Sequence, residues 1–441
     1  MFSNKDITRL MIPLIIEQAL AVTIGVADTV MVAYVGETVV SGVSIVDAIN
    51  MLLVQVFAAL ATGGAIVVAQ YLGRQNKSAA CEAAKQLFLV MGAIGITVAA
   101  ICVTWRYDIL RLVYNTVEPA VLESAQEYFY LTALSFPFFA IYNSGAALFR
   151  SQGNSRISML TALMMNVLNI GGNAIFLFGY HMGARAVGLA TLISRIVGAI
   201  VMVYLIRDSR NRVYVERMFP LNFRPRMVGT ILRIGVPTGL ENGMFHFGKL
   251  MVSGLIASFG TVAITANAVG NSITSIACIP GSAVGLGMIT VVGQCIGAGE
   301  YEQARYYIKK LLKLAYIVGG ATNILALLFM KQLVGVFLLS PQTAQLAIII
   351  SSMHAGAWLI FWPTAFTLPN GLRAAGDVKF TMIVSVSVMW ACRIGLSYVF
   401  ALYYNMGVVG VWLAMIFDWV VRTVFYITRF IGTKWHSHTV I

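Results

Sequence analysis

The chain has 441 residues, of which 59% are hydrophobic and only 11% are charged. Its mean hydropathy is +0.83, and a soluble domain carries roughly 25% charged residues, so the composition excludes a water-soluble fold. The net charge is +13, which would suit a nucleic-acid-binding protein. However, the basic residues gather between apolar segments, as in membrane proteins, and we expect no nucleic-acid partner.

Apolar segments near the ~20 residues needed to cross a bilayer follow one another along the chain. We count twelve: 10–35, 43–69, 84–105, 125–148, 157–179, 187–206, 231–257, 263–292, 312–330, 345–368, 379–404 and 407–430. Over such lengths in lipid, helices satisfy their own backbone groups, and no alternating strand pattern is present. The sequence therefore predicts an all-α integral membrane protein with twelve transmembrane helices.

Basic residues mark one side of these predicted helices. They precede the first span, lie between even and odd spans, or fill the segment 207–230, as in Lys5, Arg9, Arg74, Lys77, Arg150, Arg156, Arg305, Lys309, Lys310, Arg373 and Lys379. The opposite loops contain only Arg106, Arg111, Arg185 and Lys331. This asymmetry predicts a multi-pass protein of the cell membrane with both termini in the cytoplasm, its cations beside lipid headgroups.

Short motifs recur at a nearly constant distance of 224 or 223 residues. They are PLIIE at 13–17 and PTGLE at 237–241, QYLG at 70–73 and QCIG at 294–297, and RSQG at 150–153 and RAAG at 373–376. A constant offset over half the chain indicates a duplicated unit. We therefore predict two pseudo-symmetric six-helix lobes, residues 1–210 and 231–441, joined by a basic cytoplasmic linker at 211–230. The outer loop 106–124 is expected to contain a short helix.

Together with these paired turns, VADTVMVAYVG in the first span and the asparagine-rich MNVLNIGGN in the fifth resemble the multidrug and toxin extruders of the MATE family. The resemblance covers nearly the whole chain. It implies efflux of amphipathic, often cationic compounds, coupled to a cation and achieved by alternating access of two lobes. It also implies small-molecule organic substrates and no enzymatic activity.

Asp28 is the acidic residue in the spans with the strongest case for a function, because a carboxylate within a membrane helix is costly. It matches the helix 1 aspartate of the family pattern. Asn169 and Asn173, one helical turn apart, and Thr191 are expected partners. Such oxygens suit Na⁺, whereas a network of this kind can also tune a carboxyl group for H⁺. The family often has an aspartate where Asn173 stands, which weakens the case for Na⁺. Alternatively, the asparagines only bridge helices.

Glu17 and Glu241 occupy equivalent positions in the two repeats. Open to the cytoplasm, they would attract a cationic substrate on its way to Asp28. Alternatively, they satisfy polar groups that Pro13 and Pro237 leave free.

Aromatic residues of the fourth and tenth spans are candidates for substrate contact, namely Tyr142, Trp358 and Trp362, although such rings also serve as interface anchors. Pro137 and Pro363 can bend these helices.

Asp418 in the last span has the character of a structural acid. Arg393 in the preceding span, or Arg422 one turn further on, can neutralise it. We predict an Arg393–Asp418 pair.

The chain contains no P-loop, nucleophile elbow or metal-binding helix, so neither ATP-driven transport nor an enzyme is expected. The five cysteines have no metal-ligand spacing. We expect no cofactor besides H⁺ or Na⁺ and no obligate protein partner. The main alternative function is a flippase for a lipid-linked precursor on a related fold, which would need a cationic cavity. A channel is disfavoured by the two closed repeats.

Overall fold

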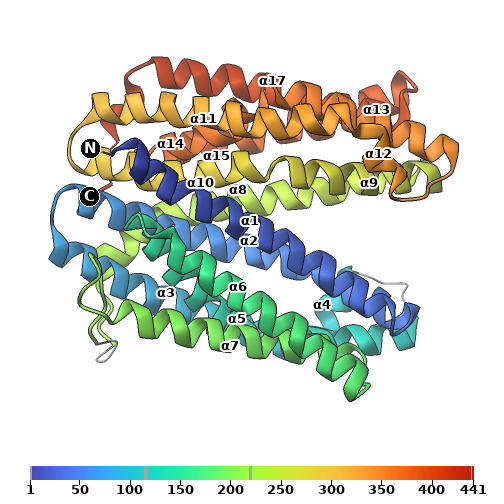
Figure 1. The fold of residues 1–441 in the computed structure, drawn as a ribbon, viewed down its shortest axis with the longest axis horizontal. Helices are drawn as coiled ribbons and strands as arrows, with labels where there is room; N and C mark the ends of the chain where they lie inside the picture. Colours follow the sequence, from blue (N-terminus) through green and yellow to red (C-terminus); the bar gives the residue numbers. More distant parts are fainter. Residues whose placement is uncertain (1, 114–117, 218–220, 439) are drawn as a thin grey trace. The chain divides into compact units, whose positions relative to one another are not determined.

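The structure, a computed structural model, describes residues 2–113, 118–217, 221–438 and 440–441. These residues form two compact units, Ser3–Gly239 and Leu240–Ile441 together with Phe2. Helices make up both units, and the described residues contain no strand, so the all-α prediction is confirmed (Figure 1). The boundary between the units lies inside a helix, a few residues after the predicted linker 211–230.

The helices of the N-terminal unit follow the predicted spans. They are α1 Asn4–Ala33, α2 Glu37–Gly73, α3 Lys77–Thr104, α4 Arg106–Val113, α5 Pro119–Ser151, α6 Ser155–Asn173, the π-helix η1 Ala174–Gly179 and α7 Ala184–Ile206; α8 Pro225–Ala257 begins in this unit. The short helix α4 confirms the helix expected in the outer loop.

The C-terminal unit has more interruptions. After α8 it contains α9 Thr261–Ala277, α10 Ile279–Gly297, α11 Tyr301–Leu328, α12 Met330–Gly335, α13 Pro341–Trp358, η2 Pro363–Thr367, α14 Leu368–Ala374, α15 Val378–Val388, η3 Met389–Gly395, α16 Leu396–Tyr398, η4 Val399–Tyr403, α17 Gly407–Ile431 and η5 Lys434–Ser437. Four of these segments, η2, η3, η4 and η5, are π- or 3₁₀-helices.

Among the described residues, ten helices are long and apolar enough to cross a membrane, and α13 and α14 form an eleventh span that bends by 67°. The remaining span is α8, whose interior carries Glu241 and Lys249. This layout agrees with the predicted twelve. The bend lies between Trp358 and Pro363, beside the expected proline, whereas α5 continues across Pro137 without a break.

The predicted span 263–292 consists of two helices that meet at Cys278. Pro280 is the second residue of α10. Proline has no backbone N–H and cannot sit inside a helix without disrupting it, but it is well tolerated in a first turn. This break was not predicted, because the apolar run in the sequence is continuous.

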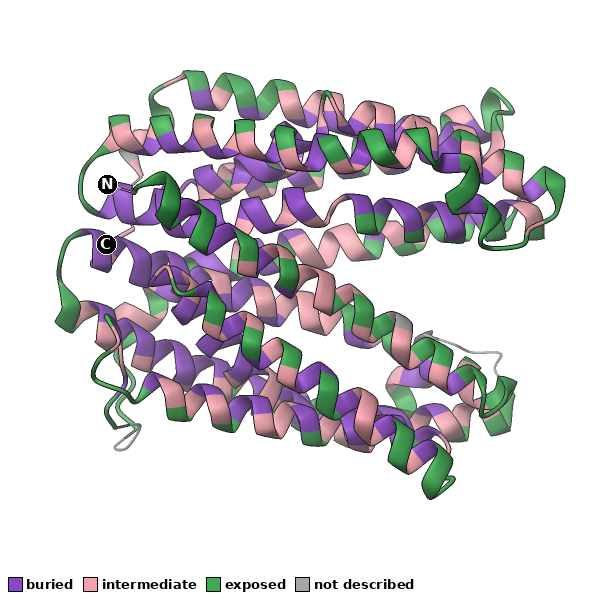
Figure 2. Ribbon diagram, in the orientation of Figure 1, coloured by how far each residue is buried: buried purple, intermediate pink, exposed green. Residues whose placement is uncertain are grey.

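In the N-terminal unit, α5 is the central helix and packs against α2, α3 and α7. Small residues permit close approach: a Cβ atom on Gly95 of α3 would lie 2.8 Å from Pro137 Cα on α5. Such contacts hold membrane helices together where the hydrophobic effect does not. Seventeen residues of α5 are buried, and Figure 2 shows exposed residues along α6 and α7 of the same unit.

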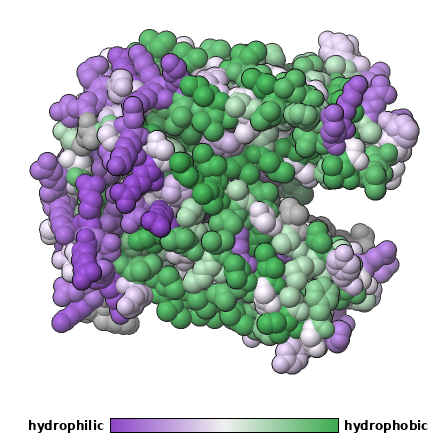
Figure 3. Space-filling model, in the orientation of Figure 1, coloured by the Kyte–Doolittle hydropathy of each residue, from purple (hydrophilic) through white to green (hydrophobic). Residues whose placement is uncertain are grey.

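Apolar side chains cover the flanks of each unit, and the hydrophilic side chains gather at the ends of the helices (Figure 3). Two of the repeated turns at these ends have glycines at positive φ, Gly153 at 84° and Gly376 at 96°. Glycine takes this conformation without the steric penalty that a Cβ atom brings. The repeated RxxG motifs therefore terminate helices, as the sequence predicts.

Candidate functional site

Asp28, Asn173, Asn169 and Thr191 form one chain of hydrogen bonds within the N-terminal unit. Asn173 Nδ2 donates to Asp28 Oδ1 at 2.6 Å and lies 3.3 Å from Asn169 Oδ1. Asn169 Nδ2 in turn donates to Thr191 Oγ1 at 3.2 Å. The structure thus brings together the four residues predicted for ion coupling, from α1, α6 and α7.

The local structure of α6 explains this arrangement. Asn169 and Asn173 are one turn apart, so their side chains lie on one face of the helix. Both are buried, whereas Asp28 is only half-buried. The π-helix η1 begins directly after Asn173, and such segments occur frequently at functional sites. Among the described residues, Asn173 Oδ1 has no hydrogen-bond partner although it is buried.

Asp47 and Arg195 add charges beside this chain. Tyr128 Oη donates to Asp47 Oδ1 at 2.8 Å. Arg195 donates to Ser135 Oγ at 2.7 Å, and its guanidinium lies 4.4 Å from the centre of the Phe139 ring. Both charged groups interact electrostatically with Asp28. Arg195 was not among the predicted site residues, although an arginine in the middle of an apolar span is a visible signal.

Glu17 is held in an ion pair that the sequence analysis did not predict. Arg150 Nη1 lies 2.6 Å from Glu17 Oε1, and Ser158 Oγ donates to Glu17 Oε2 at 2.6 Å. Arg150 belongs to the first RxxG motif, so the two motifs PLIIE and RSQG contact each other across 133 positions of the chain.

The C-terminal unit repeats this pair with the equivalent motifs. Arg373 Nη2 lies 2.6 Å from Glu241 Oε1, and Ser385 Oγ also donates to Glu241. Both glutamates are buried, with 6% and 7% exposure. In this structure neither carboxylate is an open charge, which disfavours direct capture of a cation; the partners are arginine and serine side chains, and not the groups beside Pro13 and Pro237.

Asp418 is paired with Arg422 and not with Arg393, which corrects the predicted pair. Arg422 Nε lies 3.0 Å from Asp418, one turn away on α17, and both residues are buried. Arg422 also donates to Ser385 Oγ at 3.1 Å and to the Ser385 carbonyl at 3.0 Å. Arg422 pairs with Asp418 because the two residues lie one turn apart on α17, which already places their side chains together. The Arg393 guanidinium instead lies over the Phe245 ring.

The aromatic candidates are mainly packed inside their units. Trp358 is fully buried, and its ring stacks on that of Trp362 with centroids 5.3 Å apart. The Trp358 ring lies against Gly319, leaving no room for a Cβ atom there. Tyr142 is also buried, with 9% exposure. Nothing in these contacts assigns the three rings to a substrate, and that role stays a prediction.

Within the described residues, no group of three or more His, Cys, Asp or Glu side chains is placed to hold a metal ion. A Na⁺ ion at Asp28 would need oxygens from Asn169, Asn173 and Thr191 as well. In this arrangement Asn173 directs its Nδ2 donor towards the carboxylate.

Comparisons with known proteins agree with this architecture. The uncharacterized transporter YisQ of Bacillus subtilis is 27% identical, over 96% of this chain and 93% of its own. The probable multidrug resistance protein NorM of Thermotoga maritima is 25% identical, over 99% and 94%. An outward-facing structure of a multidrug resistance MATE family transporter of the MOP superfamily superposes with a TM-score of 0.90 at 20% identity, over 98% and 96% of the chains.

The sequence profile of the MatE family matches the chain twice, at residues 13–175 and 237–399. The two matches are 224 residues apart at both ends, which is the offset of the repeated motifs. They cover most of the chain and contain Asp28, Asn169 and Asn173 as well as both ion-paired glutamates. The protein therefore belongs to the MatE family of multi-pass membrane transporters.

Proposed function

We propose that this protein is a secondary active antiporter that exports amphipathic organic compounds in exchange for protons, with Asp28 as the coupling residue. The observation that carries this proposal is the 2.6 Å hydrogen bond from Asn173 Nδ2 to Asp28 Oδ1. An ionised carboxylate only accepts hydrogen bonds, whereas a protonated one can also donate. Protonation of Asp28 thus changes the contact between α1 and α6.

This change can spread along the chain of hydrogen bonds. Asn173 also contacts Asn169, and Asn169 contacts Thr191 on α7. A rearrangement at Asp28 therefore acts on three helices of one lobe. The π-helical turn η1 supports a shift at this point, because its wider turn is a local departure from the α-helical hydrogen-bond ladder. Binding or release of the ion would bias the two lobes between inward- and outward-facing states.

Two observations favour H⁺ over Na⁺ as the coupling ion. Asn173 presents an N–H group to the carboxylate, and the family's frequent aspartate at this position is absent here. Na⁺ is the alternative, since the orphaned Asn173 Oδ1 and the Asn169 and Thr191 oxygens could contribute to a cation site.

The cargo follows less directly from the structure. The relatives named multidrug resistance proteins support a small organic compound. The expectation of a cationic cargo rested on Glu17 and Glu241 as open carboxylates, and each of them is paired with an arginine. An amphipathic cation remains the proposed cargo because Asp28 and Asp47 are acidic and could attract it.

We place the protein in the cell membrane with both termini in the cytoplasm. The basic turns that contain Arg74, Arg150 and Arg305 support this orientation by the positive-inside rule. The flippase alternative is less favoured, because the curated relatives are named as multidrug resistance proteins and a transporter.

The test uses inverted membrane vesicles, whose interior corresponds to the outside of the cell. An acidic interior should drive ethidium uptake into vesicles that contain the protein, and collapse of the pH gradient should stop it. A Na⁺ gradient without a pH gradient should drive none. Uptake driven by Na⁺ alone would replace H⁺ with Na⁺, and uptake of every tested compound without any gradient would refute antiport.

A further inference from the structure

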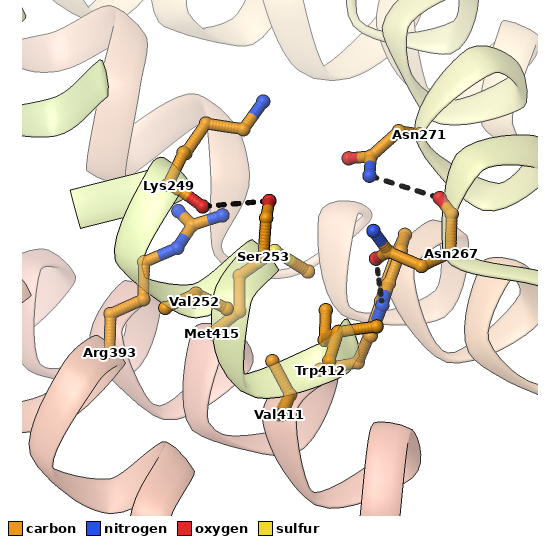
Figure 4. Close-up of a pocket in the computed structure, with 10 residues that line it drawn as sticks. Lys249, Val252, Ser253, Asn267, Asn271, Arg393, Val411, Trp412 and Met415 are labelled. Carbon is orange, nitrogen blue, oxygen red and sulfur yellow. Dashed lines mark hydrogen bonds between the residues drawn. The ribbon is translucent and has the colours of Figure 1, made fainter. Parts of the chain in front are cut away.

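The C-terminal unit contains a pocket whose charged residues play no part in the proposed coupling. It lies between α8, α9, η3 and α17 and is partly open to solvent. Figure 4 shows Lys249 and Arg393 on one side, Asn267 and Asn271 on the other, and Trp412 at the base.

Lys249 and Arg393 are two cations in one pocket, and Asp418, the acid that acts electrostatically on Arg393, is already paired with Arg422. None of the described residues places a carboxylate within ion-pair distance of either side chain. The Arg393 guanidinium instead lies 5.1 Å from the centre of the Phe245 ring. Cations inside membrane helices are costly and are usually paired. Two unpaired ones in one pocket also repel each other, and a bound anion would relieve both effects.

The asparagines supply a further donor. Trp412 Nε1 donates to Asn267 Oδ1 at 3.1 Å, and Asn271 Nδ2 donates to the Asn267 carbonyl at 3.0 Å. Trp412 occupies the Oδ1 atom of the Asn267 amide, so the Nδ2 atom of Asn267 points away from Trp412. This Nδ2 has no acceptor among the described residues. The residues that line the pocket thus include three hydrogen-bond donors, an ammonium, a guanidinium and an amide N–H.

The repeat relates this pocket to the Asp28 site. At the offset of 224 residues, Val252 is equivalent to Asp28, and Asn271 is equivalent to Asp47. Both equivalents line the pocket. The two aspartates of the N-terminal site are therefore replaced by uncharged residues in the C-terminal unit. Lys249 and Arg393 line the C-terminal pocket instead.

We propose that this pocket binds the carboxylate group of an amphipathic organic anion that the protein transports. Lys249, Arg393 and the Asn267 Nδ2 group hold the carboxylate by charge-assisted hydrogen bonds. Val252, Met415 and the Trp412 ring form the apolar walls for the remainder of the molecule. The assignment of this ligand as cargo rests on the proposed transport function, whereas its binding does not.

The test compares two ligands of nearly the same shape, naphthalene-1-acetate and its neutral amide naphthalene-1-acetamide. Binding to the purified full-length protein in detergent is measured by calorimetry. The protein should prefer the carboxylate by about tenfold, because hydrogen bonds to charged groups are stronger than neutral ones. Lys249→Gln and Arg393→Gln should each reduce this preference, and the double variant should abolish it.

Two further variants control for folding and for general charge. Lys249→Arg keeps the charge and should keep the preference. Lys309→Gln removes an exposed lysine of α11 and should have no effect. Equal binding of carboxylate and amide by the unaltered protein would overturn the proposal, as would a preference that survives in the double Gln variant with a native melting profile.

Vesicle transport separates this proposal from the proposed function. Binding that prefers the carboxylate, with no gradient-driven movement of any compound, would support the pocket and refute the antiporter. Gradient-driven export of ethidium by a protein that does not prefer the carboxylate would support the antiporter and refute the pocket.

Discussion

The two repeats of this protein share a framework and differ in the polarity of their sites. Each repeat pairs the glutamate of its first motif with the arginine of its third, at the same distance of 2.6 Å. Yet one repeat places Asp28 and Asp47 where the other has Val252 and Asn271. In the second repeat, Lys249 and Arg393 line the corresponding pocket.

This difference shows which part of a duplicated transporter is constrained by folding. The Glu17–Arg150 and Glu241–Arg373 pairs are present in both copies, in keeping with the cost of leaving one buried charge uncompensated. A site that meets ions or solutes has no such internal partner, and its charges are free to diverge. The opposite polarity of the two sites is what the two proposals, ion coupling at Asp28 and anion binding beside Lys249, are based on.

The largest effect is expected at the acidic site. Asp28→Asn should abolish pH-driven uptake of ethidium into inverted vesicles, because asparagine keeps the shape but cannot exchange a proton. Glu216→Gln, which removes an exposed acid after α7, should leave uptake unchanged. Full pH-driven uptake by an inserted Asp28→Asn protein would remove Asp28 from the coupling mechanism.

The next largest effect concerns the stability of the C-terminal unit. Asp418→Asn should lower the free energy of unfolding by about 3 kcal/mol, since it leaves the buried Arg422 without its counter-charge. Ser194, a buried polar residue of α7, donates a hydrogen bond from its Oγ to the Thr191 carbonyl at 2.9 Å. Ser194→Ala should therefore cost about 1 kcal/mol or less. Thermal unfolding in detergent compares the two, and equal losses would contradict the structural role of Asp418.

The Glu–Arg pairs that both repeats share should have equal and smaller effects on stability. Glu17→Gln and Arg150→Gln should each destabilise the protein, and the double variant should recover about 2 kcal/mol relative to the sum of the single effects. The pair Glu241 and Arg373 should behave in the same way. Coupling in one repeat but none in the other, measured by unfolding in detergent, would show that the framework is not equivalent in the two copies.

The smallest effect concerns the basic pocket. Val252→Asp restores the acid of the N-terminal repeat beside Lys249 and Arg393. It should lower the preference for naphthalene-1-acetate over its amide from about tenfold to about equal binding, since the new carboxylate competes for the same cations. An unchanged preference in calorimetry, with a native melting profile, would place the anion elsewhere.

The sequence alone was sufficient to predict the helices, the duplication and the grouping of Asp28 with Asn169, Asn173 and Thr191. Hydrophobic runs predict spans because lipid leaves the backbone few alternatives to the helix. Asn169 and Asn173 share a face because of helical periodicity, and Asp28 is an acid in an apolar run. Their predicted meeting is present in the structure as a chain of hydrogen bonds.

Other features depended on the tertiary structure. The break at Cys278 is hidden in a continuous apolar run. The pairing of Glu17 with Arg150 joins residues 133 positions apart, and the choice of Arg422 over Arg393 by Asp418 depends on side-chain geometry. Composition and periodicity determine that a segment is a helix in lipid. Which charges neutralise one another, and which are left facing a pocket, is decided only when the helices pack.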